Sequence, residues 1–530
     1  MRFVHQQPAE WLNLGIDFFY RNNEPGGYRE TMLKILRIII IPFLVIFTGC
    51  AFYNKLKVHE PNNLEKLRSE LNKIFDDPEF FNANWGVAIQ SLKTGEYIYL
   101  KNENKNFAPA SNMKLFTTAA ALIKLTPKFQ FCTTIYQNGQ ISEDGILEGD
   151  LVIRGSGDPS INNRYHDSNI TYIFETWADS LKQIGVNAIN GNIIGDDNYF
   201  EDEIMGEGWA WDYQSDWFAA QISAFSFNDN CMNIVFSAGD SVGLPVKFKL
   251  EPVTDYVEIV NKVVTVEHGL QNGIYYNRKR GTNRVEISGA LPIDFSDKRG
   301  WFSVENPTLF AATVLKQTLE KKEILVNGIA KDIDDYDDYS YSTGDQNKLF
   351  NYFSPPLWQI VETINKNSQN LYAELILRTL GAEFKDEGSA QKSIEVVKEV
   401  LTSMAINPDN FNMVDGSGLS RLNLVTPKHI ITLLRYMKNH PVNEFFYNSL
   451  PIAGIDGTLK RRLKNSSTRG NVKAKTGYLG NVVALSGYLT TGDDEELVFS
   501  IMTNNYTVPT TTAHAVQDLV CERLTNFSRN

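Results

Sequence analysis

The feature that most constrains the fold of this chain is a similar order of strands and helices at its two ends. The opening part has two strand-like runs followed by a helical pattern, at 85–92, 97–101 and 111–125. The closing part has three strand-like runs followed by a helical pattern, at 472–478, 482–490, 497–503 and 511–524. Between them, from about 130 to 345, short β-rich runs alternate with Gly, Asp and Asn turns. The sequence therefore predicts one mixed α/β domain that is split by a large β-rich insertion.

The length and composition agree with a chain of several domains. At roughly 100–200 residues per domain, 530 residues correspond to about three. Hydrophobic residues make up 42%, which is enough for a large core. We expect residues 61–130 and 346–530 to form the split domain, 131–345 the insertion, and 1–60 a signal segment and linker. The acidic stretch 332–346 is interpreted as a solvated linker.

Charge and cysteine content exclude several classes of function. Lys and Arg total 51 against 63 Asp and Glu, a net charge of -12, so the chain has no general attraction for nucleic acid. Four cysteines are too few for a disulfide scaffold, and no CxxC or HExxH motif occurs, so we expect neither a metal nor another cofactor. Cys132 and Cys231 could pair in an oxidising compartment, but the sequence does not fix their separation.

The N-terminal region predicts export. The ten apolar residues 38–47 follow two basic residues and precede Thr-Gly-Cys, and they are too few to span a bilayer, which takes about 20. This layout resembles a bacterial lipoprotein signal, in which Cys50 is lipidated and begins the mature chain, and Met32 is a plausible start. Phe47 departs from that pattern, and the alternative is an uncleaved anchor with an incidental cysteine. We expect an exported, periplasmic protein anchored to the membrane through a lipid.

The most informative motif is Ser111-Asn112-Met113-Lys114, at the start of the helical pattern. Residues i and i+3 share a helix face, so the Ser111 hydroxyl and the Lys114 amine can form a hydrogen bond. A lysine whose pKa is lowered by desolvation can activate a serine nucleophile, and a helix start favours developing negative charge. A second SxxK begins at Ser389, where we expect a helix N-cap instead.

Two further motifs follow in order, Ser368-Gln369-Asn370 (SxN) and Lys475-Thr476-Gly477 (KTG). Neither is specific by itself, because SxN also begins at three other serines, and KTG also occurs at 93–95, in a predicted turn. Taken singly, these motif residues have ordinary interpretations as a helix cap, a loop residue and a solvated strand residue. The order SxxK, SxN and KTG, each in a fitting local context, is what carries the signal.

This ordered set resembles the penicillin-recognising serine acyl enzymes, that is, the penicillin-binding proteins and β-lactamases. Six segments resemble D-alanyl-D-alanine carboxypeptidase/endopeptidases, the class C low-molecular-mass penicillin-binding proteins: APASNMKLFTTAAAL, LEGDLVIRGSGDP, SQNLYAELILRTLG, DGSGLSRLN, LPIAGIDGTL and VKAKTGYLGNV. The resemblance covers roughly residues 60–525, and it includes a large insertion between SxxK and SxN, here 257 positions (368 − 111). It implies a β-lactamase/transpeptidase-like domain with a five-stranded antiparallel sheet and helices.

The resemblance also implies the chemical roles of the first two motifs. Ser111 would be the acylated nucleophile, and Lys114 would take its proton. Ser368 would relay a proton to the leaving D-alanine. Asn370 would orient Lys114 and the substrate amide.

The third motif would bind the substrate. Lys475 and Thr476 would hold the terminal carboxylate, and Gly477 would let the substrate backbone lie against the strand. The backbone N–H groups of Ser111 and Tyr478 would form the oxyanion hole. Most members have Thr or a small residue where Tyr478 stands, and its ring could narrow the cleft.

Two weaker features lie outside the motifs. Asp158 is interpreted as a turn aspartate, although the resemblance hints at contact with a substrate amine. From 460 to 475 there are seven basic residues and no acidic one, which is typical of a solvated face and could also attract anionic stem peptides.

The function predicted from the sequence is hydrolysis of D-Ala-D-Ala termini, and of D-Ala cross-links, in peptidoglycan through an acyl-enzyme. The partners would be peptidoglycan stem peptides, with β-lactam antibiotics as inhibitors. The alternatives are a β-lactamase or esterase on the same domain, and a non-catalytic cell-wall binding protein.

Overall fold

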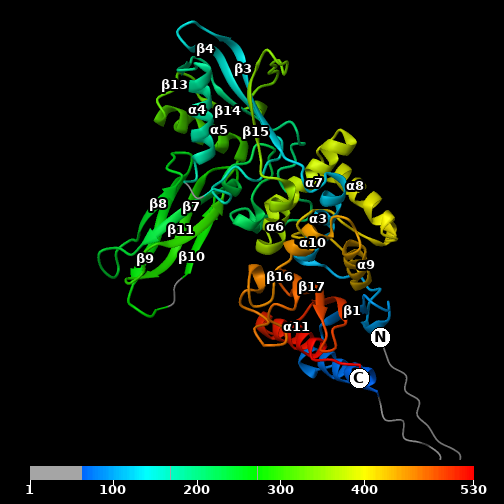
Figure 1. Ribbon diagram of the computed structural model, residues 1–530. Coiled ribbons are helices and arrows are strands. Elements are labelled where there is room, and N and C mark those ends of the chain that lie inside the picture. Colours follow the sequence, from blue (N-terminus) through cyan, green and yellow to red (C-terminus); the bar gives the residue numbers. More distant parts are fainter. Residues whose placement is uncertain (1–61, 167–168, 271–272, 530) are drawn as a thin grey trace, which may run out of the picture. The chain divides into compact units, whose positions relative to one another are not determined.

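The computed structural model describes residues 62–166, 169–270 and 273–529, and Cys50 lies outside these residues. Its first sheet joins the two ends of the chain in the order β16-β17-β18-β1-β2 (Figure 1). These strands are β16 (Lys473–Leu479), β17 (Val482–Thr490), β18 (Glu496–Asn504), β1 (Asn84–Ser91) and β2 (Tyr97–Lys101). All neighbouring pairs are antiparallel, with Val87 opposite Ile501. The predicted five-stranded antiparallel sheet is therefore confirmed.

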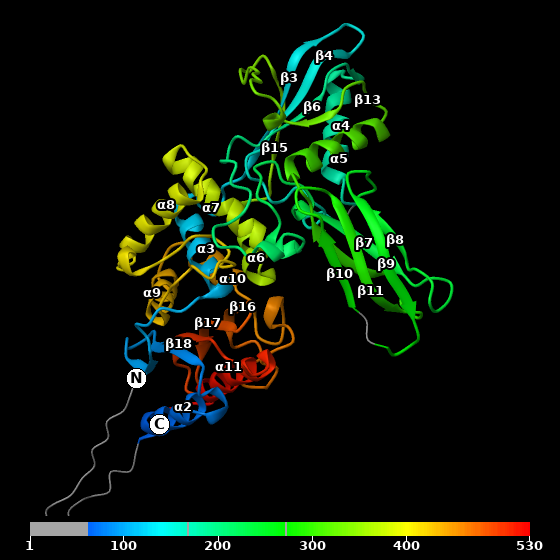
Figure 2. The ribbon, with the colours of Figure 1, turned by 180° about the vertical axis from the view of Figure 1, so that it is seen from behind.

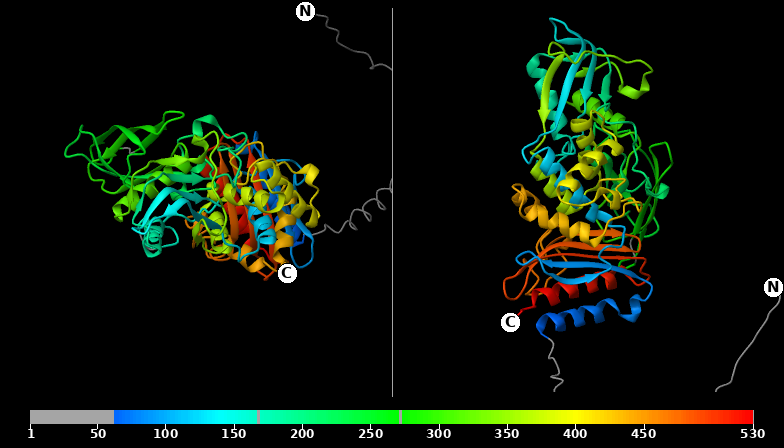
Figure 3. Two further views of the ribbon diagram at one scale, coloured as in Figure 1. Left: turned by 90° about the horizontal axis from the view of Figure 1, so that it is seen from above. Right: turned by 90° about the vertical axis from the view of Figure 1, so that its right-hand side faces the viewer.

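Helices cover both faces of this sheet (Figure 3). Alternate residues of a strand point to opposite faces, so Val87 and Ile89 pack with α2 (Asn63–Phe75) and α11 (Thr510–Thr525) in one hydrophobic core. Ala88 lies in a second core on the other face. The helices of that core are α3 (Met113–Lys124), α6 (Leu357–Asn367), α7 (Asn370–Lys385), α8 (Ala390–Ser403), α9 (Pro427–Lys438) and α10 (Asn443–Ser449). The site motifs lie on the side of this second core.

The segment between α3 and α6 forms three further sheets. The largest contains β3 (Cys132–Ile141), β4 (Ile146–Arg154), β5 (Ala188–Ile189), β6 (Ile193–Asp196), β13 (Leu325–Val326), β14 (Ala330–Asp332) and β15 (Lys348–Phe353). The two others are β12 (Lys298–Ser303), β7 (Cys231–Ser237) and β8 (Lys247–Glu251), and β10 (Gly273–Arg278), β11 (Arg284–Pro292) and β9 (Glu258–Val266). Figure 2 shows strands of both small sheets side by side.

Two helices in this segment were not predicted, α4 (Tyr172–Ile184) and α5 (Pro307–Lys321). Both bury one side in the core of the segment, as amphipathic helices do. The segment is thus a mixture of sheets and helices rather than β-structure alone.

The expectation of a solvated linker at 332–346 is wrong. Ile333 is buried, and the tyrosines of the stretch pack against it and against residues of β3, β4 and β6. The Tyr339 hydroxyl donates to Asp150 Oδ2 at 2.8 Å, and the Tyr341 hydroxyl donates to Asp196. The acidic composition of the stretch suggested exposure, but the tyrosines between the acidic residues pack onto the sheet.

Candidate active site

Ser111 and Lys114 lie where a short 3₁₀ turn, η2 (Ala110–Asn112), leads into α3. Lys114 Nζ donates a hydrogen bond to Ser111 Oγ at 2.9 Å, as the spacing of the two residues predicted. The Lys114 side chain is fully buried, whereas Ser111 is half-buried. A serine hydroxyl that contacts a buried amine is the arrangement that a serine nucleophile requires.

Two more acceptors complete the surroundings of Lys114. Its Nζ donates to Asn370 Oδ1 and to the Ser417 carbonyl, each at 2.6 Å. Burial lowers the pKa of Lys114 to about 7, although the neighbouring Asp415 and Glu374 oppose the shift. Near neutral pH a substantial share of Lys114 is therefore the neutral amine. That amine can keep donating to Asn370 and Ser417 while its lone pair accepts the Ser111 proton.

Glu374 was not singled out in the sequence, although it supports this network. It is buried on α7, four residues after Asn370, and it accepts from the backbone N–H groups of Gly416 at 2.9 Å and Ser417 at 2.7 Å. These bonds hold the turn whose Ser417 carbonyl contacts Lys114. Burial and the nearby Asp415 raise the pKa of Glu374. The i, i+4 spacing from Asn370 was the available signal, but the turn that Glu374 binds is distant in sequence.

Ser368 and Lys475 form a second serine–lysine pair. Ser368 adopts a left-handed φ of 59° in the break between α6 and α7. Lys475 Nζ donates to Ser368 Oγ and to the Thr476 carbonyl, both at 2.9 Å. The Lys475 side chain is fully buried, and burial together with the charge of Lys114 lowers its pKa well below the usual value.

The last motif residues lie beside this pair. Thr476 Oγ1 donates to Thr458 Oγ1 at 2.7 Å, and the Tyr478 side chain is 59% exposed. A Cβ on Gly477 would lie 2.7 Å from the Pro109 carbonyl and 3.1 Å from Asn112 Nδ2. Close packing of β16 against η2 therefore already requires a glycine at 477. Room for the substrate backbone at Gly477 stays a prediction beside this packing role.

The intervening segment also contributes to the site. Asn370 Nδ2 donates to the Phe218 carbonyl at 2.7 Å, which leaves Asn370 Oδ1 for Lys114. Trp209 Nε1 donates to Asp415 Oδ2 at 2.9 Å and so helps to hold the turn after Asp415. Neither contact was predicted, because both join segments that are far apart in the sequence.

The remaining predicted residues lie outside this hydrogen-bond network. Asp158 is fully buried, and its Oδ1 accepts from Ser160 N at 2.7 Å and Ser160 Oγ at 2.6 Å, which supports the turn interpretation. Burial raises the pKa of Asp158 to about 6. Contact of Asp158 with a substrate amine stays a prediction. Cys132 and Cys231 are free thiols, so the possible disulfide does not form in this structure.

The second SxxK and the basic run have structural roles. Ser389 caps α8, accepting from Lys392 N at 3.2 Å, so the N-cap prediction is confirmed. Within the run 460–475, Arg462 forms an ion pair with Asp518 at 2.6 Å. Lys475 is buried in the site, so the run is not uniformly a solvated face.

Three carboxylates elsewhere could hold a metal ion. Oxygens of Asp197, Asp332 and Asp334 lie within 4.8 Å of one another. Burial, reinforced by the neighbouring carboxylate, raises the pKa of Asp197 to about 7. None of the three belongs to the serine–lysine network.

None of the helices in the described part of the chain combines the length and apolar character needed to cross a membrane.

Comparisons with known proteins agree with this geometry. D-alanyl-D-alanine carboxypeptidase from Actinomadura sp. (strain R39) is 30% identical over 475 residues, covering 88% of this chain and 85% of that protein. D-alanyl-D-alanine carboxypeptidase DacB from Haemophilus influenzae is 28% identical over 456 residues, covering 82% and 91% of the two chains. The crystal structure of penicillin binding protein 4 (dacB) from Haemophilus influenzae superposes with a TM-score of 0.73 at 26% identity, covering 86% of this chain and 97% of that one. A structure of that protein complexed with a β-lactam superposes with a TM-score of 0.68.

The family match is continuous across all three motifs. The D-Ala-D-Ala carboxypeptidase 3 (S13) family matches residues 67–526, which include Ser111, Ser368 and Lys475. The match therefore covers both parts of the five-stranded sheet and the segment between them. With this match and the serine–lysine geometry, the chain belongs to the D-Ala-D-Ala carboxypeptidase 3 (S13) family.

Proposed function

We infer that this chain is a penicillin-binding serine D,D-peptidase, and we propose that Ser111 is its acylated nucleophile. Peptidoglycan is the substrate of this enzyme, and β-lactams bind the enzyme. The observation that carries the assignment of Ser111 is its 2.9 Å hydrogen bond to the buried Lys114, whose pKa is lowered to about 7. Within the described residues the other SxxK serine, Ser389, is a helix cap with no such partner.

In the acylation step, neutral Lys114 takes the proton of Ser111 as Oγ bonds to the carbonyl carbon of the penultimate D-alanine. The C–N bond to the terminal D-alanine then breaks, and the proton held by Lys114 passes to the departing amine with Ser368 as the relay. Asn370 supports this step because its Oδ1 accepts from Lys114. Backbone N–H groups of Ser111 and Tyr478 stabilise the oxyanion, each contributing about 3–4 kcal/mol.

In the deacylation step, a water molecule attacks the Ser111 ester, and Lys114 takes a proton from that water. That proton returns to Ser111 Oγ as the shortened peptide leaves. The same sequence with a β-lactam opens the lactam ring and leaves a Ser111 ester. All proton transfers use groups within the serine–lysine network.

Lys475 and Thr476 bind the terminal carboxylate of the substrate in this proposal. A buried amine next to Lys114 is costly to charge, and its pKa is low for that reason. An arriving carboxylate favours the ammonium form of Lys475. The resulting positive charge then favours the neutral, basic form of Lys114, so substrate binding and base activation are coupled.

The finer points of the assignment belong to this proposal as well. We assign D-Ala cross-links as a second substrate, 61–130 with 346–530 as the catalytic domain, and 131–345 as its insertion. An enzyme of cell-wall peptidoglycan is exported, and lipidation of Cys50 would hold it at the membrane. Intact mass of membrane-extracted protein tests this point: a diacylglyceryl cysteine at the N-terminus is expected, and a chain that begins after Cys50 contradicts it.

Replacing the nucleophile tests the function. Ser111→Ala should abolish both covalent labelling by a fluorescent penicillin and release of D-alanine from a D-Ala-D-Ala tripeptide, while Ser389→Ala should leave both intact. Fast penicillin turnover without D-alanine release would favour a β-lactamase instead. Absence of both activities in the unmutated chain would favour a non-catalytic binding protein.

A further inference from the structure

A cavity of about 480 Å³ adjoins the serine site through two short backbone segments. Asn367 and Gln369, which flank Ser368, both line it. Trp217 lines it too, and the next residue is Phe218, whose carbonyl accepts from Asn370 Nδ2. The cavity therefore shares its wall with the SxN segment. Its volume lies within the range of about 300–1,000 Å³ that is typical of ligand sites.

The far wall of this cavity is one face of the β12–β7 pair. Trp301 lies opposite Asn233 in the antiparallel register. Because side chains alternate along a strand, Arg299 shares a face with Trp301, and Cys231 shares one with Asn233. All four line the cavity. The intervening residues Met232, Ile234 and Phe302 are buried in the hydrophobic core of the segment. One face of the β12–β7 pair therefore lines the cavity, and the other face packs in the core.

The cavity presents two partly exposed indole rings among amide side chains. Trp217 is 44% exposed and Trp301 is 47% exposed. Indole faces provide flat apolar platforms for the C–H face of a pyranose ring. Asn163, Asn228 and Gln369 also line the cavity, and amides both donate to and accept from hydroxyl and acetamido groups. This combination is suited to a sugar.

The charged groups of the cavity are already paired. Arg164 forms an ion pair with Asp229 at 2.5 Å, and Asp229 also accepts from Gln369 Nε2 at 3.2 Å. Arg299 lies 3.4 Å from Glu251. A wall whose guanidinium groups already face carboxylates favours an uncharged polar ligand over the charged end of a peptide.

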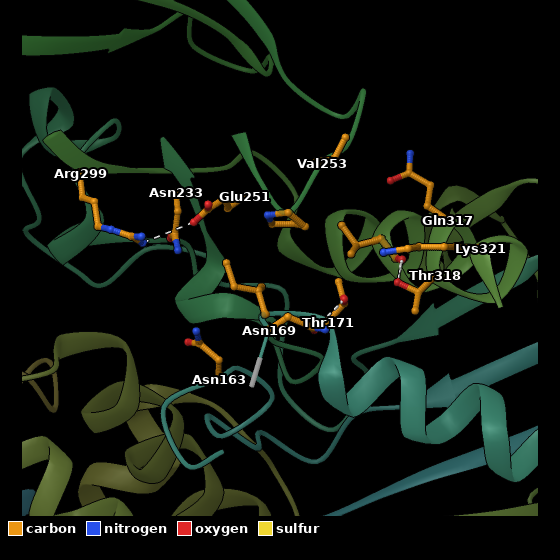
Figure 4. Close-up of a pocket in the computed structure, with 13 residues that line it drawn as sticks. Asn163, Asn169, Thr171, Asn233, Glu251, Val253, Arg299, Gln317, Thr318 and Lys321 are labelled. Atoms are coloured by element: carbon orange, nitrogen blue, oxygen red, sulfur yellow. Dashed lines mark hydrogen bonds and ion pairs between the residues drawn. The ribbon is translucent and has the colours of Figure 1, made fainter. Parts of the chain in front are cut away.

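A second cavity, of about 650 Å³, adjoins the first, and Figure 4 shows the residues that line it. The two cavities share Asn163, Asn233 and Arg299 in their linings. Figure 4 also shows Gln317 and Thr318 of α5 at its other side. The second cavity combines polar side chains such as Asn169 and Gln317 with apolar ones such as Val253, and it extends the lined surface beyond the first cavity, as a polymeric ligand requires.

We propose that the cavity with Trp217 and Trp301 binds an N-acetylated hexosamine of the peptidoglycan glycan strand. This inference rests on the proposed function, because that function supplies a substrate in which stem peptides are attached to such a strand. The cavity would hold the sugar while a stem peptide occupies the serine site. Nothing in the catalytic chemistry itself depends on it.

Direct binding of a peptide-free sugar tests the proposal without turnover. The probe is the uncharged disaccharide of two N-acetylglucosamine units, titrated into the full chain and followed by saturation-transfer NMR. We expect saturable binding that Trp301→Ala weakens about tenfold, the size of one aromatic contact, and that Trp301→Phe restores in part. Trp211→Ala is the matched control, because Trp211 is 73% exposed and lines neither cavity. Unchanged thermal unfolding midpoints verify the fold of each variant.

A kinetic comparison provides the second readout. The ratio of kcat/KM for a disaccharide-bearing stem peptide to that for the bare peptide should fall in Trp301→Ala and stay constant in Trp211→Ala. The proposal would be overturned if the sugar showed no saturable binding, or if Trp301→Ala and Trp211→Ala weakened that binding equally. If Trp301→Ala weakens bare peptide as much as sugar, the cavity belongs to the stem peptide, which also overturns it. If the unmutated chain binds the sugar but releases no D-alanine, the proposed function is refuted, and only the sugar site at Trp301 remains of this inference.

Discussion

The two serine–lysine pairs of the site have similar contacts but different origins. Ser111 and Lys114 are three positions apart on one helical turn, whereas Ser368 and Lys475 come from a helix break and a strand 107 positions apart. Both lysines are fully buried, and burial lowers both pKa values. Lys114 has two further acceptors, and the charges of Asp415 and Glu374 raise its pKa against the effect of burial. The charge of Lys114 instead adds to the effect of burial and lowers the pKa of Lys475 further.

This difference separates two tasks. The carboxyl groups near Lys114 keep its pKa close to neutrality, which suits a base that must gain and lose a proton in each cycle. Lys475 lacks this compensation, so a substrate carboxylate is the natural source of the missing negative charge. In the proposed mechanism Lys114 is thus the base and Lys475 the recognition group, while Ser368, the partner of Lys475, relays the proton to the leaving amine.

Removing the base should give the largest effect. Lys114→Ala should slow acylation by a labelled penicillin by about 10²–10⁴-fold, because general-base assistance is lost. Lys392→Ala, in the second SxxK, is the matched control and should acylate at the normal rate. Stopped-flow labelling measures both rates. A loss below about tenfold in Lys114→Ala would mean that another group deprotonates Ser111.

Removing the recognition amine should cost less and should depend on the substrate. A charge-assisted bond is worth roughly 1.5–3 kcal/mol, so Lys475→Gln should lower kcat/KM for a free D-Ala-D-Ala peptide by about 10- to 150-fold. The same peptide with an amidated carboxylate should lose much less, and Lys475→Arg should recover only part of the loss. Lys473→Gln on the same strand is the control. Equal losses for both substrates with a shifted pH profile would give Lys475 a role in tuning Lys114 instead.

A substitution that disturbs the packing between the two serine–lysine pairs should have a moderate effect on stability. Gly477 lies where β16, which contains Lys475, packs against the η2 turn, which contains Ser111. Gly477→Ala should lower the free energy of unfolding by about 1–3 kcal/mol, since the new methyl meets backbone that cannot move freely. Gly480→Ala, whose Cβ would meet only the end of the Arg421 side chain, should change it by less than about 0.5 kcal/mol. Denaturant titration measures both, and equal stabilities would contradict the packing role.

The smallest effect concerns pH. With a Lys114 pKa of about 7, the acylation rate should rise with pH through neutrality, because the neutral amine is the reactive form. The Glu374 charge raises the pKa of Lys114, so Glu374→Gln should move the midpoint to lower pH. A midpoint that moves upward, or a rate that falls as pH rises through 7, would contradict this account of the base.

The contrast between the pairs also explains what the sequence could predict. The Ser111–Lys114 bond follows from helical spacing, and the five strands follow from the strand-like runs near both ends of the chain. Their assembly into one antiparallel sheet was implied by the family resemblance. Glu374 and the Phe218 carbonyl were missed because they reach the site only through tertiary packing, and any residue can supply a backbone carbonyl. The α4 and α5 helices were missed because the β-rich runs around them dominated the pattern.

The most direct test of the central claim is to identify the residue that a penicillin acylates. The full chain is labelled with a fluorescent penicillin and digested, and the modified peptide is mapped by mass spectrometry. The account predicts one ester, on Ser111, in the peptide that also contains Lys114. An ester on Ser368, on Ser389 or on any other serine would contradict it.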